Sequence, residues 1–95
     1  MFEWNEEKRK QVIKDHGVDF ALIKDIFDDS FAVVFEDAKH STDQEARYSI
    51  IGQTAQYGLI HASYTYRSES TIRFITARRA ENWMVRDYEK YRKRL

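Results

Sequence analysis

Arginines crowd the second half of the chain, where their spacing could build an anion site. The stretch from residue 59 to residue 79 carries Arg67, Arg73, Arg78 and Arg79. A guanidinium binds a phosphate through two parallel hydrogen bonds, and tyrosine rings can stack on unpaired bases. The tyrosines that could do so are Tyr64, Tyr66, Tyr88 and Tyr91, although Tyr88 and Tyr91 also fit the packing stripe of the predicted C-terminal helix and are interpreted as core residues. These residue types indicate a surface for a phosphate-rich ligand such as RNA.

Cleavage of RNA without a metal needs three things. A group must remove the 2′-hydroxyl proton, cations must stabilise the charge on the phosphorane, and a group must protonate the leaving oxygen. Arginines meet the second need, but they cannot serve as the base because they stay protonated. His61, in the middle of a predicted strand, we interpret as a tolerated polar position rather than a base, and His16 as a donor at a helix end.

The arginines lie on a predicted hairpin, with a strand on each side of the turn RSES. Side chains alternate along a strand, so His61, Ser63, Thr65 and Arg67 should share one side of the first strand. In the second strand, alternation groups Arg73 with Ile75 and Ala77, opposite the face of Ile72, Phe74 and Thr76. We therefore expect Arg67 and Arg73 to flank the turn. Carboxylates elsewhere in the chain could instead claim both as ion pairs.

The net charge of zero hides two unlike halves. Residues 1–45 hold six Lys and Arg against twelve Asp and Glu, and residues 46–95 hold ten against four. This asymmetry favours a basic surface that meets a polyanion. The alternative is that the two halves neutralise each other across the folded domain.

Several classes of site are excluded or disfavoured. The chain has no cysteine, so it cannot form disulfides or thiolate metal sites. His16, His40 and His61 show no metal-binding spacing, and neither a G-x-S-x-G elbow nor a glycine-rich phosphate loop is present. No apolar run reaches the length of a membrane span. We expect no metal, no cofactor and no membrane association, and a cytoplasmic location.

The periodicity predicts one α+β domain over residues 1–95. Asn5 should cap a first helix that Gly17 ends, and Asp19 should cap a second helix over residues 20–27. Strands are expected at 31–35 and 47–54, followed by the two strands of the hairpin, and a C-terminal helix at 80–95. The predicted fold has two N-terminal helices, a four-stranded, largely antiparallel sheet and a C-terminal helix packed on it, with all helices against one side.

An ordered set of short motifs resembles the BrnT family over residues 2–89. The matching pieces are FEW near the start, Lys8, HGV, the loop HSTDQEAR, IIG, TYR, TIRFITARRA and a late Tyr88-Glu89. Val12, Thr76, Glu81 and Met84 depart from the residues common in that family. His16 and His40 match its two histidine positions, and His61 matches none.

The resemblance implies a RelE-like fold and the toxin of a type II toxin–antitoxin system. Such a toxin is a metal-independent endoribonuclease that inhibits translation. It also implies a BrnA-like antitoxin that neutralises the toxin and binds operator DNA with it, and it allows a dimer of toxin–antitoxin pairs.

Carried onto this chain, the resemblance gives six candidate site residues. Arg67, Arg73 and Arg78 are predicted to hold the scissile phosphate, and Lys8, Arg47 and Arg79 are predicted to bind RNA. The alternative is a non-catalytic interaction module that acts with an antitoxin in DNA-bound autoregulation.

Overall fold

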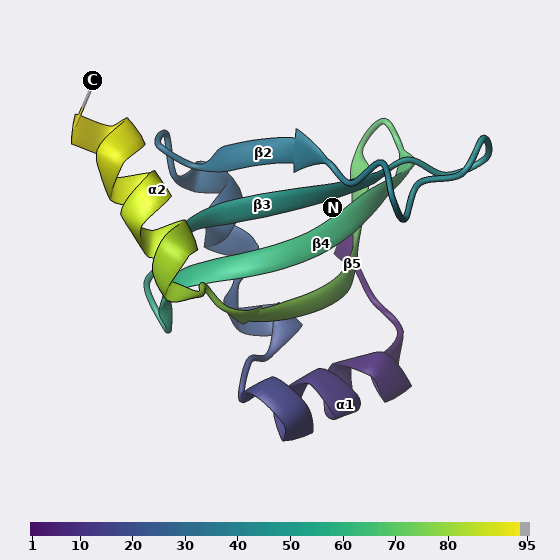
Figure 1. Ribbon diagram of the computed structural model, residues 1–95. Coiled ribbons are helices and arrows are strands. Elements are labelled where there is room, and N and C mark those ends of the chain that lie inside the picture. Colours follow the sequence, from purple (N-terminus) through teal and green to yellow (C-terminus); the bar gives the residue numbers. More distant parts are fainter. Residues whose placement is uncertain (94–95) are drawn as a thin grey trace.

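One mixed sheet organises the chain in the computed structural model, which describes residues 1–93. The sheet order is β1-β5-β4-β3-β2, with β1 parallel to β5 and the other pairs antiparallel. The elements are β1 (Phe2–Glu3), α1 (Glu6–His16), the 3₁₀ helices η1 (Phe20–Leu22) and η2 (Lys24–Asp28), β2 (Val33–Glu36), β3 (Arg47–Thr54), β4 (Gly58–Ser68), β5 (Thr71–Arg79) and α2 (Asn82–Lys93). Figure 1 shows α1 beyond the β5 side of the sheet and α2 crossing the strands. The α+β prediction is confirmed. Arg94 and Leu95, the end of the expected C-terminal helix, lie outside the described residues.

The described residues contain five strands, and the sequence predicted four. The additional strand, β1, places Phe2 opposite Ile72 and Glu3 opposite Arg73. Two residues are too few to show an alternating pattern, so β1 carries no recognisable strand signal. Its pairing sets the Glu3 carboxylate beside Arg73 of β5 and Arg67 of β4.

The first helix ends where the sequence predicts. The Asn5 side chain accepts a hydrogen bond from the Lys8 amide at 3.0 Å, which satisfies an N–H group that has no partner within the helix. Gly17 adopts φ 67°, a left-handed conformation that glycine reaches without strain, and its amide donates to the Ile13 carbonyl. These two caps hold α1, and with it Lys8, at a defined place beside β5.

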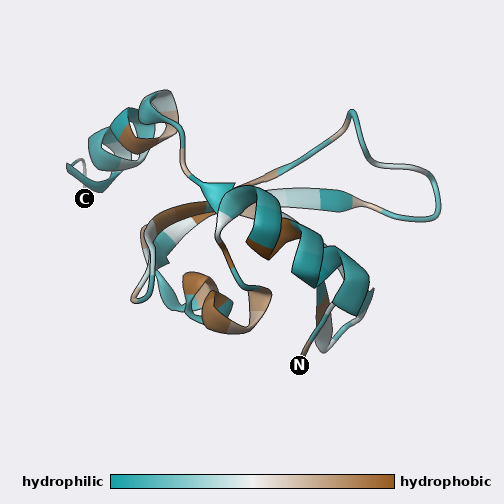
Figure 2. Ribbon diagram, turned by 90° about the horizontal axis from the view of Figure 1, so that it is seen from below, coloured by the Kyte–Doolittle hydropathy of each residue, from teal (hydrophilic) through white to brown (hydrophobic). Residues whose placement is uncertain are grey.

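The second predicted helix is wrong in type. Residues 20–28 form η1 and η2, which are short 3₁₀ segments instead of one α-helix. Asp19 does act as the predicted cap, because its carboxylate accepts from the Ala21 amide at 2.9 Å. Apolar residues of this segment pack under the sheet (Figure 2), and η2 lies so close to β3 that a Cβ on Gly52 would sit 2.8 Å from Ile26 Cγ1.

The helices cover both faces of the sheet, not one as predicted. On one face η1 and η2 supply Phe20, Ile23 and Ile26 to the main core, together with Ile50 of β3. On the other face α2 packs Met84 and Tyr88 against Ile51. Ile50 and Ile51 are neighbours on a strand and point to opposite sides, so each serves a different core. We call the face that carries Ile51 and α2 the outer face.

A β-bulge in β5 decides which arginines share the outer face. Ser63 pairs with Thr76 but Tyr64 pairs with Phe74, which leaves Ile75 as an extra residue. Phe74 and Ala77 are therefore both buried in the main core. Strict alternation had grouped Ala77 with Arg73 and Thr76 with Phe74, and the bulge overturns that grouping. It also brings Arg73 and Arg78, an odd and an even position, onto the same face.

Substitution Tyr88→Phe should reveal how α2 is attached. The Tyr88 hydroxyl donates to Asp29 Oδ2 at 2.7 Å, and burial together with this bond raises the pKa of Tyr88 to about 12. For Asp29, burial alone would raise the pKa, but hydrogen bonds from Tyr88, Gln53 and Phe31 outweigh it and lower the pKa. Because Tyr88 donates to a charged acceptor, we expect the substitution to lower the free energy of unfolding by about 2 kcal/mol.

The pH dependence follows from the depressed pKa of Asp29. The stabilisation is complete above the unfolded carboxyl pKa of about 4 and is lost as pH falls through the lower folded pKa. Urea unfolding should therefore show a difference between wild type and Tyr88→Phe that shrinks in acid. Tyr91→Phe on the exposed side of α2 is the control. An equal effect of both substitutions would contradict the role of Asp29.

None of the helices in the described part of the chain combines the length and apolar character needed to cross a membrane.

Candidate active site

Three adjoining cavities form one groove on the outer face, which we call the cationic groove. Their volumes are about 200, 270 and 270 Å³. Lys8, Arg47 and Ile75 line both the first and the second cavity. The second and third share residues of β4, β5 and the loop before β3, namely Asp37, His40, Ser63 and Thr76. The shared residues make the groove continuous.

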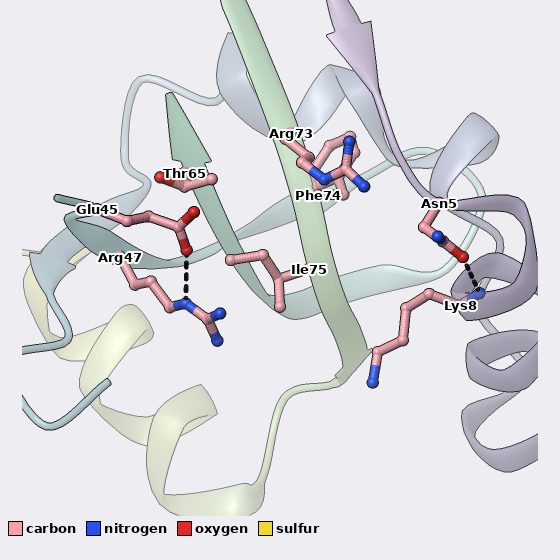
Figure 3. A pocket seen from close by; sticks show the side chains of 8 residues that line it. All are labelled: Asn5, Lys8, Glu45, Arg47, Thr65, Arg73, Phe74 and Ile75. Atoms are coloured by element: carbon pink, nitrogen blue, oxygen red, sulfur yellow. Dashed lines mark hydrogen bonds and ion pairs between the residues drawn. The ribbon is translucent and has the colours of Figure 1, made fainter. Parts of the chain in front are cut away.

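The first cavity brings together cations from three elements. Lys8 comes from α1, Arg47 from β3 and Arg73 from β5. Figure 3 shows the Lys8 and Arg47 side chains on either side of Ile75. In the described part of the chain Lys8 pairs with no carboxylate, so its ammonium is free to meet an anion. Sequence reasoning named all three cations as site residues, and the structure places them around one hollow.

The third cavity collects the three histidines and Arg78. His16 is the last residue of α1, His40 lies in the loop before β3, and His61 lies in the middle of β4. No sequence spacing joins these histidines, because they come together only through the fold. Within residues 1–93 no group of three or more His, Asp or Glu side chains has an arrangement that could hold a metal ion.

His61 and His40 differ in their surroundings. His61 Nε2 is buried and has no hydrogen-bond partner among residues 1–93. Burial lowers the pKa of His61, and the positive charge of Arg78 lowers it further. His40 is more open, with 58% of its side chain exposed, and its Nδ1 lies 2.7 Å from Asp37 Oδ2. This contact lowers the pKa of Asp37.

Each arginine of the groove has a carboxylate nearby. Arg73 Nη1 donates to Glu3 Oε2 at 2.6 Å, Arg47 Nε to Glu45 Oε1 at 3.0 Å, and Arg78 Nη2 lies 3.4 Å from Glu81 Oε1. The three carboxylate side chains are 37–49% exposed. Ion pairs this close to solvent contribute only about 0–1 kcal/mol. Breaking these ion pairs should therefore cost little free energy.

The remaining two predicted arginines do not line the cavities. Arg67 Nε lies 3.9 Å from Glu3 Oε2, so Glu3 sits between Arg67 and Arg73 at the end of the hairpin. Arg79 follows Arg78 on the strand and points the other way. Its Nη1 donates to the Tyr57 carbonyl at 3.0 Å, and its guanidinium lies 5.4 Å from the Tyr57 ring centroid. The side chains of Arg78 and Arg79 thus lie on different faces of the sheet.

Comparison with known proteins places the chain in a family. A family model described as the ribonuclease toxin BrnT of a type II toxin–antitoxin system matches residues 4–82. The chain belongs to the BrnT family. This confirms the resemblance seen in the sequence motifs.

A solved BrnT structure has the same fold. The crystal structure of the Brucella abortus ribonuclease toxin BrnT is similar to this chain with a TM-score of 0.68 and 26% sequence identity. The match covers 86% of this chain and 99% of that one. A comparison with curated proteins found no match. The family model describes ribonuclease toxins of toxin–antitoxin systems, so the membership of this chain in the family implies an antitoxin partner.

Sequence reasoning missed several residues of the groove. Asp37, Ser63 and Thr76 line it but were not predicted as site residues. Asp37 and His40 are three residues apart in a polar loop, and such a spacing has meaning only once the loop conformation is known. Ser63 of β4 pairs with Thr76 of β5 next to the bulge, which the alternation of apolar residues did not reveal.

Proposed function

We propose that this chain is a metal-independent endoribonuclease toxin that inhibits translation, and that its RNA substrate lies along the cationic groove. The observation that carries the proposal is the gathering of Lys8, Arg47, Arg73 and Arg78 around one continuous groove. These cations come from a helix and two strands that lie apart in the sequence. Their placement on rigid elements supports phosphate binding without reorganisation.

The chemistry assigned to the groove is transfer of a phosphoryl group to the adjacent 2′-hydroxyl. In this proposal Arg73 and Arg78 contact the RNA phosphates, with Arg78 nearest to the histidines and the reacting atoms. Lys8 and Arg47 steer the strand between them. Ser63 and Thr76, at the floor of the groove, supply hydroxyl groups for further hydrogen bonds. Arg67, outside the cavities, would meet RNA that extends past Glu3.

The proposal also covers the partners. A BrnA-like antitoxin would neutralise the toxin in the cytoplasm and bring it to operator DNA, which the toxin would not contact by itself. Family membership supports an antitoxin. We further propose that toxin–antitoxin pairs associate as dimers and that the fold is related to RelE toxins.

Cleavage of a defined RNA in excess chelator tests the proposal. Purified chain without antitoxin should cleave the RNA, leaving a 2′,3′-cyclic phosphate and a 5′-hydroxyl end. An RNA with deoxyribose at the cleaved position should resist, because the nucleophile is missing. Absence of cleavage, or cleavage only when a divalent metal is added, would refute the mechanism.

Removal of the cations of the first two cavities should weaken RNA binding in a salt-dependent way. Lys8→Ala and Arg47→Ala each remove one phosphate contact, so the slope of log K against log salt should become shallower by about 0.7 for single-stranded RNA. A salt titration by fluorescence anisotropy measures this slope. Lys14→Ala, on the same helix but outside the groove, should leave it unchanged. Equal slopes for all variants would place the RNA elsewhere.

The carboxylates beside Arg47, Arg73 and Arg78 favour a second candidate, in which these arginines serve structure and the chain only binds a protein partner. Such a module would form a complex with its antitoxin and leave RNA intact. The chelator experiment separates the two, because only the enzyme cleaves RNA in the absence of antitoxin.

A further inference from the structure

We propose that Asp37 and His40 form the proton-transfer dyad of the groove, with His40 as the general base and Asp37 as its positioning residue. The inference rests on the proposed ribonuclease function and names the group that the arginines cannot supply. It goes beyond phosphate binding, because it assigns the step that starts the reaction.

The position of His40 is the first support. It lines both the second and the third cavity, so it stands where the two hollows meet. Lys8 and Arg47 line one side of this junction and Arg78 the other. A phosphate seated over the junction would have cations on both sides and His40 within reach of the neighbouring ribose.

The tautomer of His40 is the second support. An ionised carboxylate can only accept hydrogen bonds, and the pKa of Asp37 is held below its usual range by the bond from His40. At 2.7 Å from Asp37 Oδ2, His40 Nδ1 must therefore carry the proton of the neutral ring. Its Nε2 is left with a free lone pair, as a general base requires. The 58% exposure of the side chain leaves it accessible to a substrate.

The other histidines of the cavity lack these features. His61 Nε2 is buried, and none of the described residues gives it a hydrogen-bond partner. Neither His61 nor His16 has a carboxylate that fixes its tautomer among the ion pairs of residues 1–93. Asp37 also keeps His40 in place through the turn itself, since the His40 amide donates to the Asp37 carbonyl at 3.2 Å.

The step balances with the groups present and water. The 2′ O–H bond breaks and its proton moves to His40 Nε2, while the 2′ oxygen forms a bond to phosphorus. The bond from phosphorus to the 5′ oxygen breaks, and that oxygen takes a proton from water. The imidazolium then returns its proton to solvent. The products are a 2′,3′-cyclic phosphate and a 5′-hydroxyl.

Single-turnover cleavage of a defined RNA in chelator tests the dyad. His40→Ala should slow cleavage by at least about 100-fold, the usual contribution of a general base. Binding of an uncleavable 2′-O-methyl RNA should change less than about threefold, because His40 is not a phosphate cation. Added imidazole should restore part of the rate of His40→Ala, which a merely structural defect would not allow. His40→Gln, which keeps the side-chain volume, should be equally slow.

Asp37→Asn is the test of positioning. The amide retains the shape and the turn but can donate to Nδ1, which would favour the wrong tautomer of His40. We expect cleavage to slow by at least about tenfold, with RNA binding unchanged. Asp43→Asn, an exposed position in the same loop, should cleave like wild type and controls for the charge.

The outcomes separate the dyad from the proposed function. Wild type that does not cleave RNA would overturn the ribonuclease and the dyad together. Wild type that cleaves while His40→Ala and His40→Gln keep the full rate would overturn the dyad alone. A slow His40→Ala variant that imidazole does not rescue and that binds RNA poorly would also overturn it, because the loss would then be structural.

Discussion

Replacement of Arg78 by alanine should lower kcat/KM for RNA by about 100- to 1000-fold, whereas the same change at Arg79 should alter it by only a few-fold. The two residues are adjacent and carry the same charge, but they lie on opposite sides of β5. Arg78 lines the third cavity with the histidines. Arg79 is bound to the Tyr57 carbonyl on the other side. The comparison therefore separates position in the groove from charge alone.

The size of the Arg78 effect follows from the mechanism. A pre-positioned donor to the oxygens of a phosphorane acts mainly in the transition state, so its loss should appear in kcat more than in binding. Glu81 lies 3.4 Å from Arg78, and Glu81→Gln should leave the fold intact while it frees the guanidinium. Stopped assays of initial rate at several RNA concentrations measure both parameters. Equal losses for Arg78→Ala and Arg79→Ala would indicate a general charge effect and would contradict the assignment.

Phe74→Ala should lower the free energy of unfolding by about 3–5 kcal/mol. Phe74 is 1% exposed, and its ring lies nearly parallel to those of Phe2 and Phe20 at centroid distances of 5.6 and 5.5 Å. It joins β1, η1 and β5 in a single aromatic stack. A domain of this size is stable by only about 5–15 kcal/mol, so the substitution removes a large part of the total.

Two comparisons make the Phe74 prediction specific. Phe74→Leu keeps much of the volume and should cost about 1.5 kcal/mol or less. Phe35→Ala, on the exposed part of β2, should stay within about 0.5 kcal/mol. Urea denaturation followed by tryptophan fluorescence gives all three values. A loss below about 1 kcal/mol for Phe74→Ala would show that the stack does not hold the sheet together.

The sequence predicted those features that depend on local chemistry. The two ends of α1, at Asn5 and Gly17, could be predicted because helix caps act within a few residues. Arg73 and Arg78 were identified by type. Their shared face, however, depends on the extra residue Ile75, and a bulge is decided by packing across the sheet. The short strand β1 and the 3₁₀ form of residues 20–28 were also not predicted, because both depend on contacts with residues distant in sequence.

The same limit applies to the site. His16, His40 and His61 were judged separately because they are far apart in the chain, and only the fold brings them to one cavity. The Asp37–His40 contact lies in a polar loop without periodicity, so no pattern marks it. The family motifs located the loop but gave no role to its carboxylate. Residue types could thus be read from the sequence, whereas their convergence could not.

The position of bound RNA tests the central claim most directly. An uncleavable 2′-O-methyl RNA can be titrated into isotope-labelled chain while backbone amide shifts are followed. We predict that the largest shifts lie along the cationic groove, at Ser63, Thr76 and the residues next to Lys8 and Arg47. Shifts confined to the acidic segment around Asp25 and Asp28, or no shifts at all, would contradict the account.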